Sequence, residues 1–238
     1  MSLTIDISNI DTTYDHLFEA RHQLTWWPWI GNKFNSANKK TLILGESTYN
    51  WNPKSEQVKE RINREDHLRI LHQNHALQLN RKSKYVRNIE RAIFQSKSPA
   101  LADKEMLWST VVYHNLVLRP MATLKHRPSY NDYKLGWEEV LYISDILTID
   151  QCIVYGLENN KITSLLEVLK NSNINYEHNK ISSKIGNSRP SVITLNTSTR
   201  PLKLVFIRHP SAFFSWKNWG AFLKNEILLP SQNAYASK

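Results

Sequence analysis

One short apolar run, Leu204–Ile207, constrains the fold more than any other stretch of the chain. It is partly β-branched and too short for a helix, so it predicts a buried β-strand. The strand has to end before Pro210, because proline has no N–H to donate to a sheet ladder. Ser215 can then cap a helix that carries Trp216 and Trp219 on one face. A strand that leads directly into a helix is typical of α/β folds.

Three further apolar runs repeat this pattern. They predict strands at Thr41–Leu44, around Thr110–Tyr113 and at Cys152–Tyr155, with helical spacing of apolar residues between them. Residues 1–238 therefore predict a single α/β domain, a three-layer α/β/α sandwich around a short, mainly parallel four-stranded sheet. Ser191–Leu195 predicts an added strand at the edge of that sheet.

The charge balance narrows the class of partner. The chain carries a formal net charge of +10 and a pI near 9.6, which favours an anionic partner, first of all DNA. A membrane is the competing interpretation, but no stretch approaches the ~20 apolar residues of a span and no basic amphipathic helix stands out.

The single cysteine, Cys152, excludes internal disulfides and four-cysteine clusters. The N-terminus has no apolar signal segment, so we expect a cytoplasmic protein.

Two stretches have both a structural and a functional interpretation. Trp26, Trp27 and Trp29 form a dense run, and we interpret at least two of them as a hydrophobic plug beside the core. The alternative is a platform on which nucleobases stack. The basic residues from Arg81 to Arg91 form either a solvated helix face or a surface that binds phosphates.

A polar, histidine-containing segment at residues 55–79 predicts one or two exposed helices. His72 and His75 are three residues apart and could share a helical face that holds a metal ion. No carboxylate or cysteine joins them at a recognisable spacing, so we interpret them as part of a solvated face. We expect no metal, no cofactor and a monomeric protein.

Polar turns follow three of the predicted strands. They are Gly45–Tyr49, His114–Asn115 and His209–Ser211. The carboxyl ends of parallel strands meet at one edge of a sheet, where ligands bind in open α/β folds. Three such turns in one cleft indicate an active site far better than any one of them alone.

The residues around these turns resemble motifs of the uracil-DNA glycosylase superfamily. LILGESTY resembles the strand and glycine turn of its first motif, YHNLVLRP the strand that carries a base-reading asparagine, and FIRHPSAFFS a His-Pro-Ser motif followed by an intercalating loop. The resemblance covers roughly residues 26–225. It implies an enzyme that flips a nucleotide out of DNA and hydrolyses its N-glycosidic bond.

The resemblance also implies a role for each matching residue. His209 would donate to the O2 atom of the leaving base, Asn115 would bind the edge of the base, and the Tyr49 ring would limit substituents at its C5 atom. Ser211 would hold a phosphate, and exposed Phe213 or Phe214 would fill the gap left by the flipped nucleotide. The residues predicted to be catalytic are His209, Glu46 and Asn115; those predicted to bind the base are Gly45, Ser47, Tyr49 and Asn115; those predicted to bind DNA are Ser211, Phe213, Phe214, Arg127 and Lys217.

Two departures from the family pattern leave the substrate open. Ser47 stands where the most active branch has a water-activating aspartate, and Thr48 replaces the usual proline. Glu46 is then the candidate that positions water, with a structural hydrogen bond as the alternative. The expected substrate is a damaged base, or a modified base in phage DNA. Two alternatives remain: an inactive nucleic-acid-binding protein of the same fold, and a small-molecule hydrolase that uses His209 with Glu46.

Overall fold

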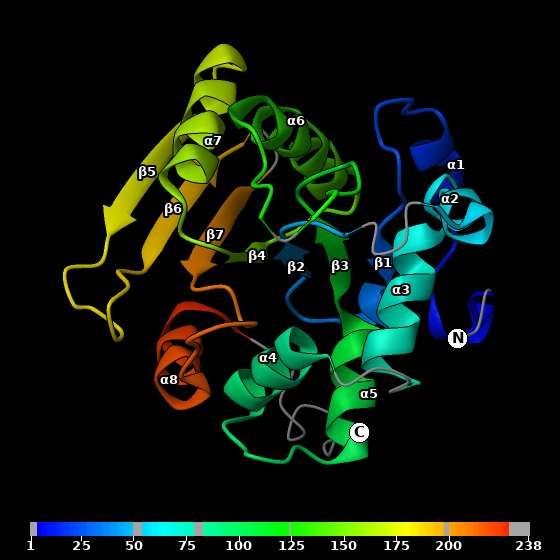
Figure 1. Cartoon of the computed structure of the whole chain (residues 1–238). Coiled ribbons are helices and arrows are strands. Elements are labelled where there is room, and N and C mark those ends of the chain that lie inside the picture. The colour runs from blue at the N-terminus through cyan, green and yellow to red at the C-terminus, as the bar shows by residue number, and fades with distance from the viewer. Residues whose placement is uncertain (1–3, 50–53, 79–82, 124, 198–199, 229–238) are drawn as a thin grey trace.

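A mixed β-sheet forms the middle of the molecule (Figure 1). The computed structural model describes residues 4–49, 54–78, 83–123, 125–197 and 200–228. Within these ranges the sheet has seven strands in the order β1-β3-β2-β4-β7-β6-β5. The strands are β1 (Trp29–Ile30), β2 (Thr41–Gly45), β3 (Val112–Asn115), β4 (Gln151–Tyr155), β5 (Asn175–Lys180), β6 (Ser191–Asn196) and β7 (Pro201–Ile207).

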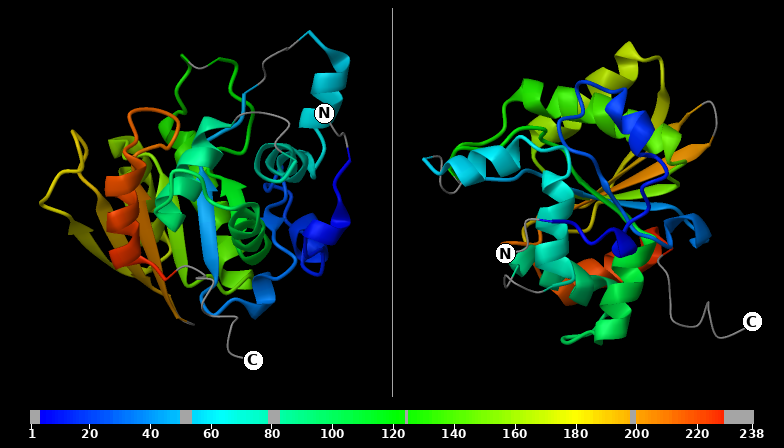
Figure 2. Two further views of the ribbon diagram at one scale, coloured as in Figure 1. Left: turned by 90° about the horizontal axis from the view of Figure 1, so that it is seen from below. Right: turned by 90° about the vertical axis from the view of Figure 1, so that its right-hand side faces the viewer.

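Helices cover both faces of the sheet (Figure 2). They are α1 (Asp15–Glu19), α2 (Glu56–Ile62), α3 (His67–Ala76), α4 (Lys84–Phe94), α5 (Leu101–Thr110), α6 (Tyr130–Ile146), α7 (Asn159–Asn171) and α8 (Trp216–Glu226), with short 3-10 turns η1 (Ile7–Asn9) and η2 (Phe34–Ser36). Alternate strand residues point to opposite faces, which divides the core in two. Leu42 and Leu44 pack with α6 and α7, whereas Ile43 packs with α3, α4, α5 and α8.

The predicted α/β class is confirmed, but the predicted number of strands is wrong. The four predicted parallel strands are present as β3, β2, β4 and β7, which pair in parallel at the centre of the sheet. Antiparallel β1 extends one side, and the antiparallel hairpin of β5 and β6 extends the other. The segment Ser191–Leu195 is a strand, yet β5 covers it, so it is not at the edge. All residues of β5 except the half-buried His178 are exposed, so its polar sequence carries no apolar signal for a strand.

The prediction of exposed helices at residues 55–79 is wrong for α3. His67 and His72 are only 3% and 0% exposed, because α3 lies against the sheet. The His72 ring stacks on Tyr113 with a centroid distance of 4.3 Å and meets the edge of Trp108 at 4.5 Å. Aromatic rings thus bury a histidine that a polarity pattern places in solvent.

The tryptophan plug is confirmed for two residues. Trp26 and Trp29 are fully buried, and their indole N–H groups donate to the carbonyl oxygens of Ile62 at 2.8 Å and Trp108 at 2.9 Å. A buried indole needs such a partner. These bonds join Trp26 and the first residue of β1 to α2 and α5.

The turn from strand to helix near the C-terminus is also as predicted. β7 ends at Ile207, and the Ser215 hydroxyl accepts a hydrogen bond from the N–H of Asn218 at the start of α8. Among the described residues, no helix is both long enough and apolar enough to cross a bilayer.

Candidate functional site

A cavity of about 540 Å³ lies at the carboxyl edge of the parallel strands. All three predicted turns contribute to its lining. Of the predicted site residues, it brings together Gly45, Glu46, Ser47, Tyr49, Asn115, Arg127, His209 and Ser211. Residues 45 to 49 follow β2, Asn115 ends β3, and His209 follows β7. The parallel register therefore assembles side chains from distant parts of the sequence.

Three predicted DNA-binding residues lie outside the cavity lining. Phe213 is 89% exposed and has a positive φ of 49°. Lys217 is exposed in the first turn of α8. The expectation that Phe214 is exposed is wrong, because its ring is half-buried and stacks on Trp219 with a centroid distance of 6.0 Å. Of the two phenylalanines, only Phe213 has the exposure that a wedge needs.

Asn115 is held in place across the ends of two strands. Gly45 is its register partner, and a Cβ atom at position 45 would overlap Asn115 Oδ1 and the Tyr113 hydroxyl. Glycine is therefore required for this close approach. The Tyr113 hydroxyl donates to Asn115 Oδ1 at 3.1 Å. No described residue bonds to Nδ2 of Asn115, which leaves two N–H donors at the cavity.

Further hydroxyl groups support Asn115 from behind. The Tyr85 ring stacks on the Tyr113 ring with a centroid distance of 6.5 Å, and His75 Nδ1 lies 3.0 Å from the Tyr85 hydroxyl. Burial raises the pKa of Tyr85 to about 12 and that of Tyr113 well above its ordinary value, so both hydroxyls keep their protons. Asn115 is therefore backed by two tyrosine hydroxyls that stay uncharged.

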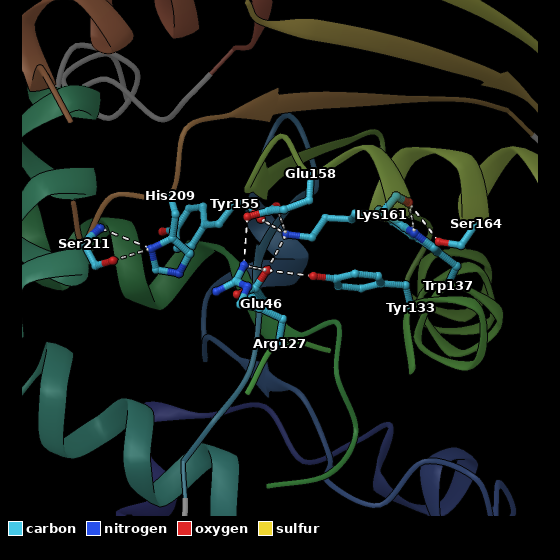
Figure 3. A network of polar contacts seen from close by, with 10 residues as sticks. All are labelled: Glu46, Arg127, Tyr133, Trp137, Tyr155, Glu158, Lys161, Ser164, His209 and Ser211. Atoms are coloured by element: carbon cyan, nitrogen blue, oxygen red, sulfur yellow. Dashed lines mark hydrogen bonds and ion pairs between the residues drawn. The ribbon is translucent and has the colours of Figure 1, made fainter. Parts of the chain in front are cut away.

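His209 presents a neutral ring with a defined tautomer. Its Nδ1 accepts the backbone N–H of Ser211 at 3.2 Å and lies 2.8 Å from the Ser211 hydroxyl (Figure 3). A backbone N–H can only donate, so Nδ1 carries no proton and Nε2 carries it. Burial lowers the pKa of His209 to about 4, although Glu46 opposes this shift. The imidazole is therefore uncharged at neutral pH and offers Nε2–H as a donor.

Glu46 is a buried anion held by three donors. Its Oε1 accepts from Lys161 Nζ at 3.0 Å, the Tyr133 hydroxyl at 3.0 Å and Arg127 Nη2 at 3.2 Å (Figure 3). Burial alone would raise the pKa of Glu46, but the charges of Lys161 and Arg127 hold it below the ordinary value. Within the described structure no donor bonds to Oε2. That oxygen is left to act on a ligand or on water.

Three residues of the site, Lys161, Tyr133 and Glu158, were not predicted from the sequence. Lys161 is fully buried in the first turn of α7, where Nζ donates to Tyr155 O at 2.6 Å and Glu158 Oε2 at 2.9 Å. Gly156 has a φ of 99°, and a Cβ atom there would overlap Glu158 and Lys161. The sequence does carry a signal for Glu158 and Lys161, because β4 is followed by Gly156 and then by a helix. Polar residues after a predicted parallel strand were the criterion for the other three turns, and the same criterion selects these two residues.

The remaining turn residues add hydroxyl groups to the cavity. The buried hydroxyl oxygens of Ser47 and Thr48 have no hydrogen-bond partner in the part of the chain that is described. Tyr49 is half-buried and lines the same wall. Of the basic segment, Lys84 lines the cavity, whereas Arg81 and Lys82 lie outside the described residues.

The described histidines form no metal centre. No group of three or more His, Cys, Asp or Glu side chains within the described ranges is placed to hold a metal ion. His72 instead lies among aromatic rings, and neither of its ring nitrogens has a hydrogen-bond partner there. Burial lowers the pKa of His72 well below its usual value.

The chain matches no protein-family model, and a search of curated proteins gives no match either. The class of protein therefore rests on the site itself: a neutral imidazole donor, an amide donor and a buried carboxylate around one cavity.

Proposed function

We propose that this protein is a DNA glycosylase that flips a damaged or modified base into the cavity and hydrolyses its N-glycosidic bond, leaving an abasic site. The observation that carries the proposal is that His209, Asn115 and Glu46 line one cavity with complementary charge states. The reaction needs a donor for the departing base and an anion for the sugar, and these residues supply both.

The donor side acts on the base. When the bond between the base and C1′ breaks, its electron pair leaves with the base, and negative charge gathers on the base's carbonyl oxygen. The neutral His209 donates its Nε2–H to that oxygen without having to lose or gain a full charge. A fixed donor of this kind stabilises charge that develops in the transition state. Asn115 Nδ2–H donates to a second acceptor on the base edge.

The anionic side acts on the sugar. Loss of the base leaves a cationic, oxocarbenium-like sugar, and the Glu46 carboxylate stabilises that cation electrostatically. Because the pKa of Glu46 is lowered, it is a weak base. Water adds readily to an oxocarbenium ion, so Oε2 needs only to orient the water whose oxygen bonds to C1′. The proton released from that water passes to solvent or to the departing base.

The charge of the molecule fits a DNA substrate. The net charge of +10 supplies the attraction for phosphates, and Arg127 and Lys84 are cations at the cavity itself. Exposed Phe213 stands beside the cavity on the loop that carries His209 and Ser211. These features favour a glycosylase over a hydrolase of small molecules.

A panel of DNAs tests the proposal. Oligonucleotides with deaminated, alkylated or phage-modified bases are incubated with the protein, and abasic sites are detected as alkali-labile breaks and free bases by mass spectrometry. We expect base release by the wild type, loss of release in His209→Ala and Asn115→Ala, retention in a His22→Ala control, and no effect of EDTA. If no substrate in the panel yields free base, the proposal fails.

One observation favours a second candidate, a nucleic-acid-binding protein that has the same site without activity. Ser47 stands at the usual aspartate position, and three donors already engage Glu46 Oε1. This candidate predicts salt-dependent DNA binding without base release. Detection of free base would exclude it.

A further inference from the structure

The C-terminal part of the chain has an extreme charge bias. Residues 178–225 contain eight Lys and Arg residues and no Asp or Glu. The fold separates these cations into two groups, because β6 runs antiparallel to β7. Ser191 at the start of β6 pairs with Phe206 near the end of β7, so the tip of the β5–β6 hairpin, residues 181–190, lies at the same edge as the cavity.

At the opposite edge, two of these cations are paired with acids. Lys203, near the start of β7, lies 2.7 Å from Glu226 Oε2, and Arg200 lies 3.7 Å from Asp150 Oδ1. At the cavity edge, Lys180, Lys184 and Arg189 are exposed, and none of them forms an ion pair with a carboxylate of the described chain. Unpaired cations repel one another and lower the stability of the fold, so a patch of them indicates an anionic ligand.

The hairpin tip is an ordered structure joined to the site. Ile185 and Ser188 form an isolated β-bridge around Gly186, whose φ is 58°. Arg208, which precedes His209, donates from Nη1 to the Ser188 hydroxyl at 2.9 Å. The same guanidinium donates from Nε to Ala212 O at 3.1 Å and lies 5.4 Å from the centre of the Phe213 ring. Figures 1 and 2 show the hairpin loop on the α8 side of the molecule.

We propose that the tip of the β5–β6 hairpin binds the DNA backbone next to the flipped nucleotide, through Lys180, Lys184 and Arg189. This inference rests on the proposed function, since it extends the DNA contact of the same site. Arg208 fixes the distance between the hairpin and the Phe213 loop. The hairpin therefore presents its cations to phosphates of the DNA that Phe213 enters, and it contributes affinity without taking part in bond cleavage.

Charge-matched variants test this surface. Lys180→Gln, Lys184→Gln and Arg189→Gln are combined in one protein, and Lys33→Gln, Lys170→Gln and Lys224→Gln, which lie at exposed positions toward the opposite edge, are combined in a control with the same net charge. Binding to a lesion-free DNA duplex is measured by fluorescence anisotropy over a range of salt. We expect the hairpin variant to bind about 10-fold more weakly, and its salt slope to fall by about 0.9 for each lost phosphate contact. The control keeps the wild-type slope.

The outcomes separate this inference from the proposed function. Equal binding by the two variants overturns the hairpin proposal, whether or not base release is found. Weaker binding by the hairpin variant supports it even if no base is released. If both variants bind DNA equally and only the hairpin variant loses binding to anionic phosphatidylglycerol vesicles, the surface serves a membrane and the proposal is wrong. Thermal melts of both variants verify that these exposed substitutions leave the fold intact.

Discussion

The two walls of the cavity hold polar groups in opposite ways. The charged wall consists of Glu46, Arg127 and Glu158 with Lys161 behind them, and its charges are satisfied by ion pairs. The neutral wall consists of His209, Asn115, Tyr113 and Tyr85, and its groups are kept uncharged by burial or engaged by hydrogen bonds. A cationic sugar suits the first wall and a departing base suits the second. One cavity therefore holds a stable anion next to a stable neutral imidazole.

Acid should produce the largest effect, because it protonates His209 of the neutral wall together with other buried histidines. Burial lowers the pKa of His209 and His67 to about 4 and that of His114 to about 3, whereas the unfolded chain has values near 6.5. The unfolded state therefore binds more protons as the pH falls below 6.5. Each such histidine reduces the free energy of unfolding by about 1.4 kcal/mol per pH unit until its folded pKa is reached. Denaturant titrations between pH 7 and pH 4 measure this loss.

A further buried histidine, His72, provides a variant that tests this prediction. His72→Phe keeps an aromatic ring in the aromatic cage and removes one proton-binding site, so the pH dependence should become shallower by about 1.4 kcal/mol per pH unit. A phenylalanine in place of exposed His22 should leave it unchanged. Parallel curves for wild type and His72→Phe would contradict the assignment of a buried neutral His72.

Removal of the cation from the charged wall should have the next largest effect. Lys161→Met leaves the carboxylates of Glu46 and Glu158 without their buried partner, which typically costs about 3–5 kcal/mol in the free energy of unfolding. The double variant Lys161→Met/Glu46→Gln should recover part of the loss. Lys134→Met, which breaks only the exposed pair with Glu167, should change stability far less. Equal losses in both single variants would mean that the network is not a buried one.

Loss of the imidazole should mainly affect the rate. His209→Ala should reduce single-turnover base release by about 10²–10³-fold, because one preorganised donor is removed from the transition state. The pKa of about 4 predicts that this histidine causes no fall in the wild-type rate between pH 8 and pH 6. A rate that rises as the pH falls through 6.5 would instead indicate a protonated His209.

The smallest predicted effect concerns how Tyr113 orients Asn115 in the neutral wall. Tyr113→Phe removes the hydrogen bond to Asn115 Oδ1, which is worth about 1 kcal/mol. The Asn115 side-chain amide can then turn and present Oδ1 instead of Nδ2–H to the base. Release of a base that has a carbonyl at the edge facing Asn115 should therefore fall roughly 5-fold relative to release of a base that has an amino group there. Unchanged relative rates would show that Tyr113 does not orient Asn115.

The sequence was most informative where an element has an apolar signal. Leu42–Leu44 and Leu204–Ile207 predict strands because both faces of a central parallel strand are buried. The same reasoning does not find β5, whose side chains are largely exposed, or the burial of His72, which depends on rings from three other elements. Lys161 is a similar case. A lysine at a helix start is expected in solvent, and only the two carboxylates near it explain its burial.

By itself, the order of residues determined the alternation of strands and helices and the three polar turns that follow strands, because hydrophobic periodicity and turn chemistry are local properties. The tertiary structure alone decided that Glu46 Oε1 is held by Lys161, that His209 carries its proton on Nε2, and that the hairpin cations reach the cavity edge. Charge states and tautomers depend on neighbours brought from distant positions, and the free energy that sets them exists only once those neighbours are in contact.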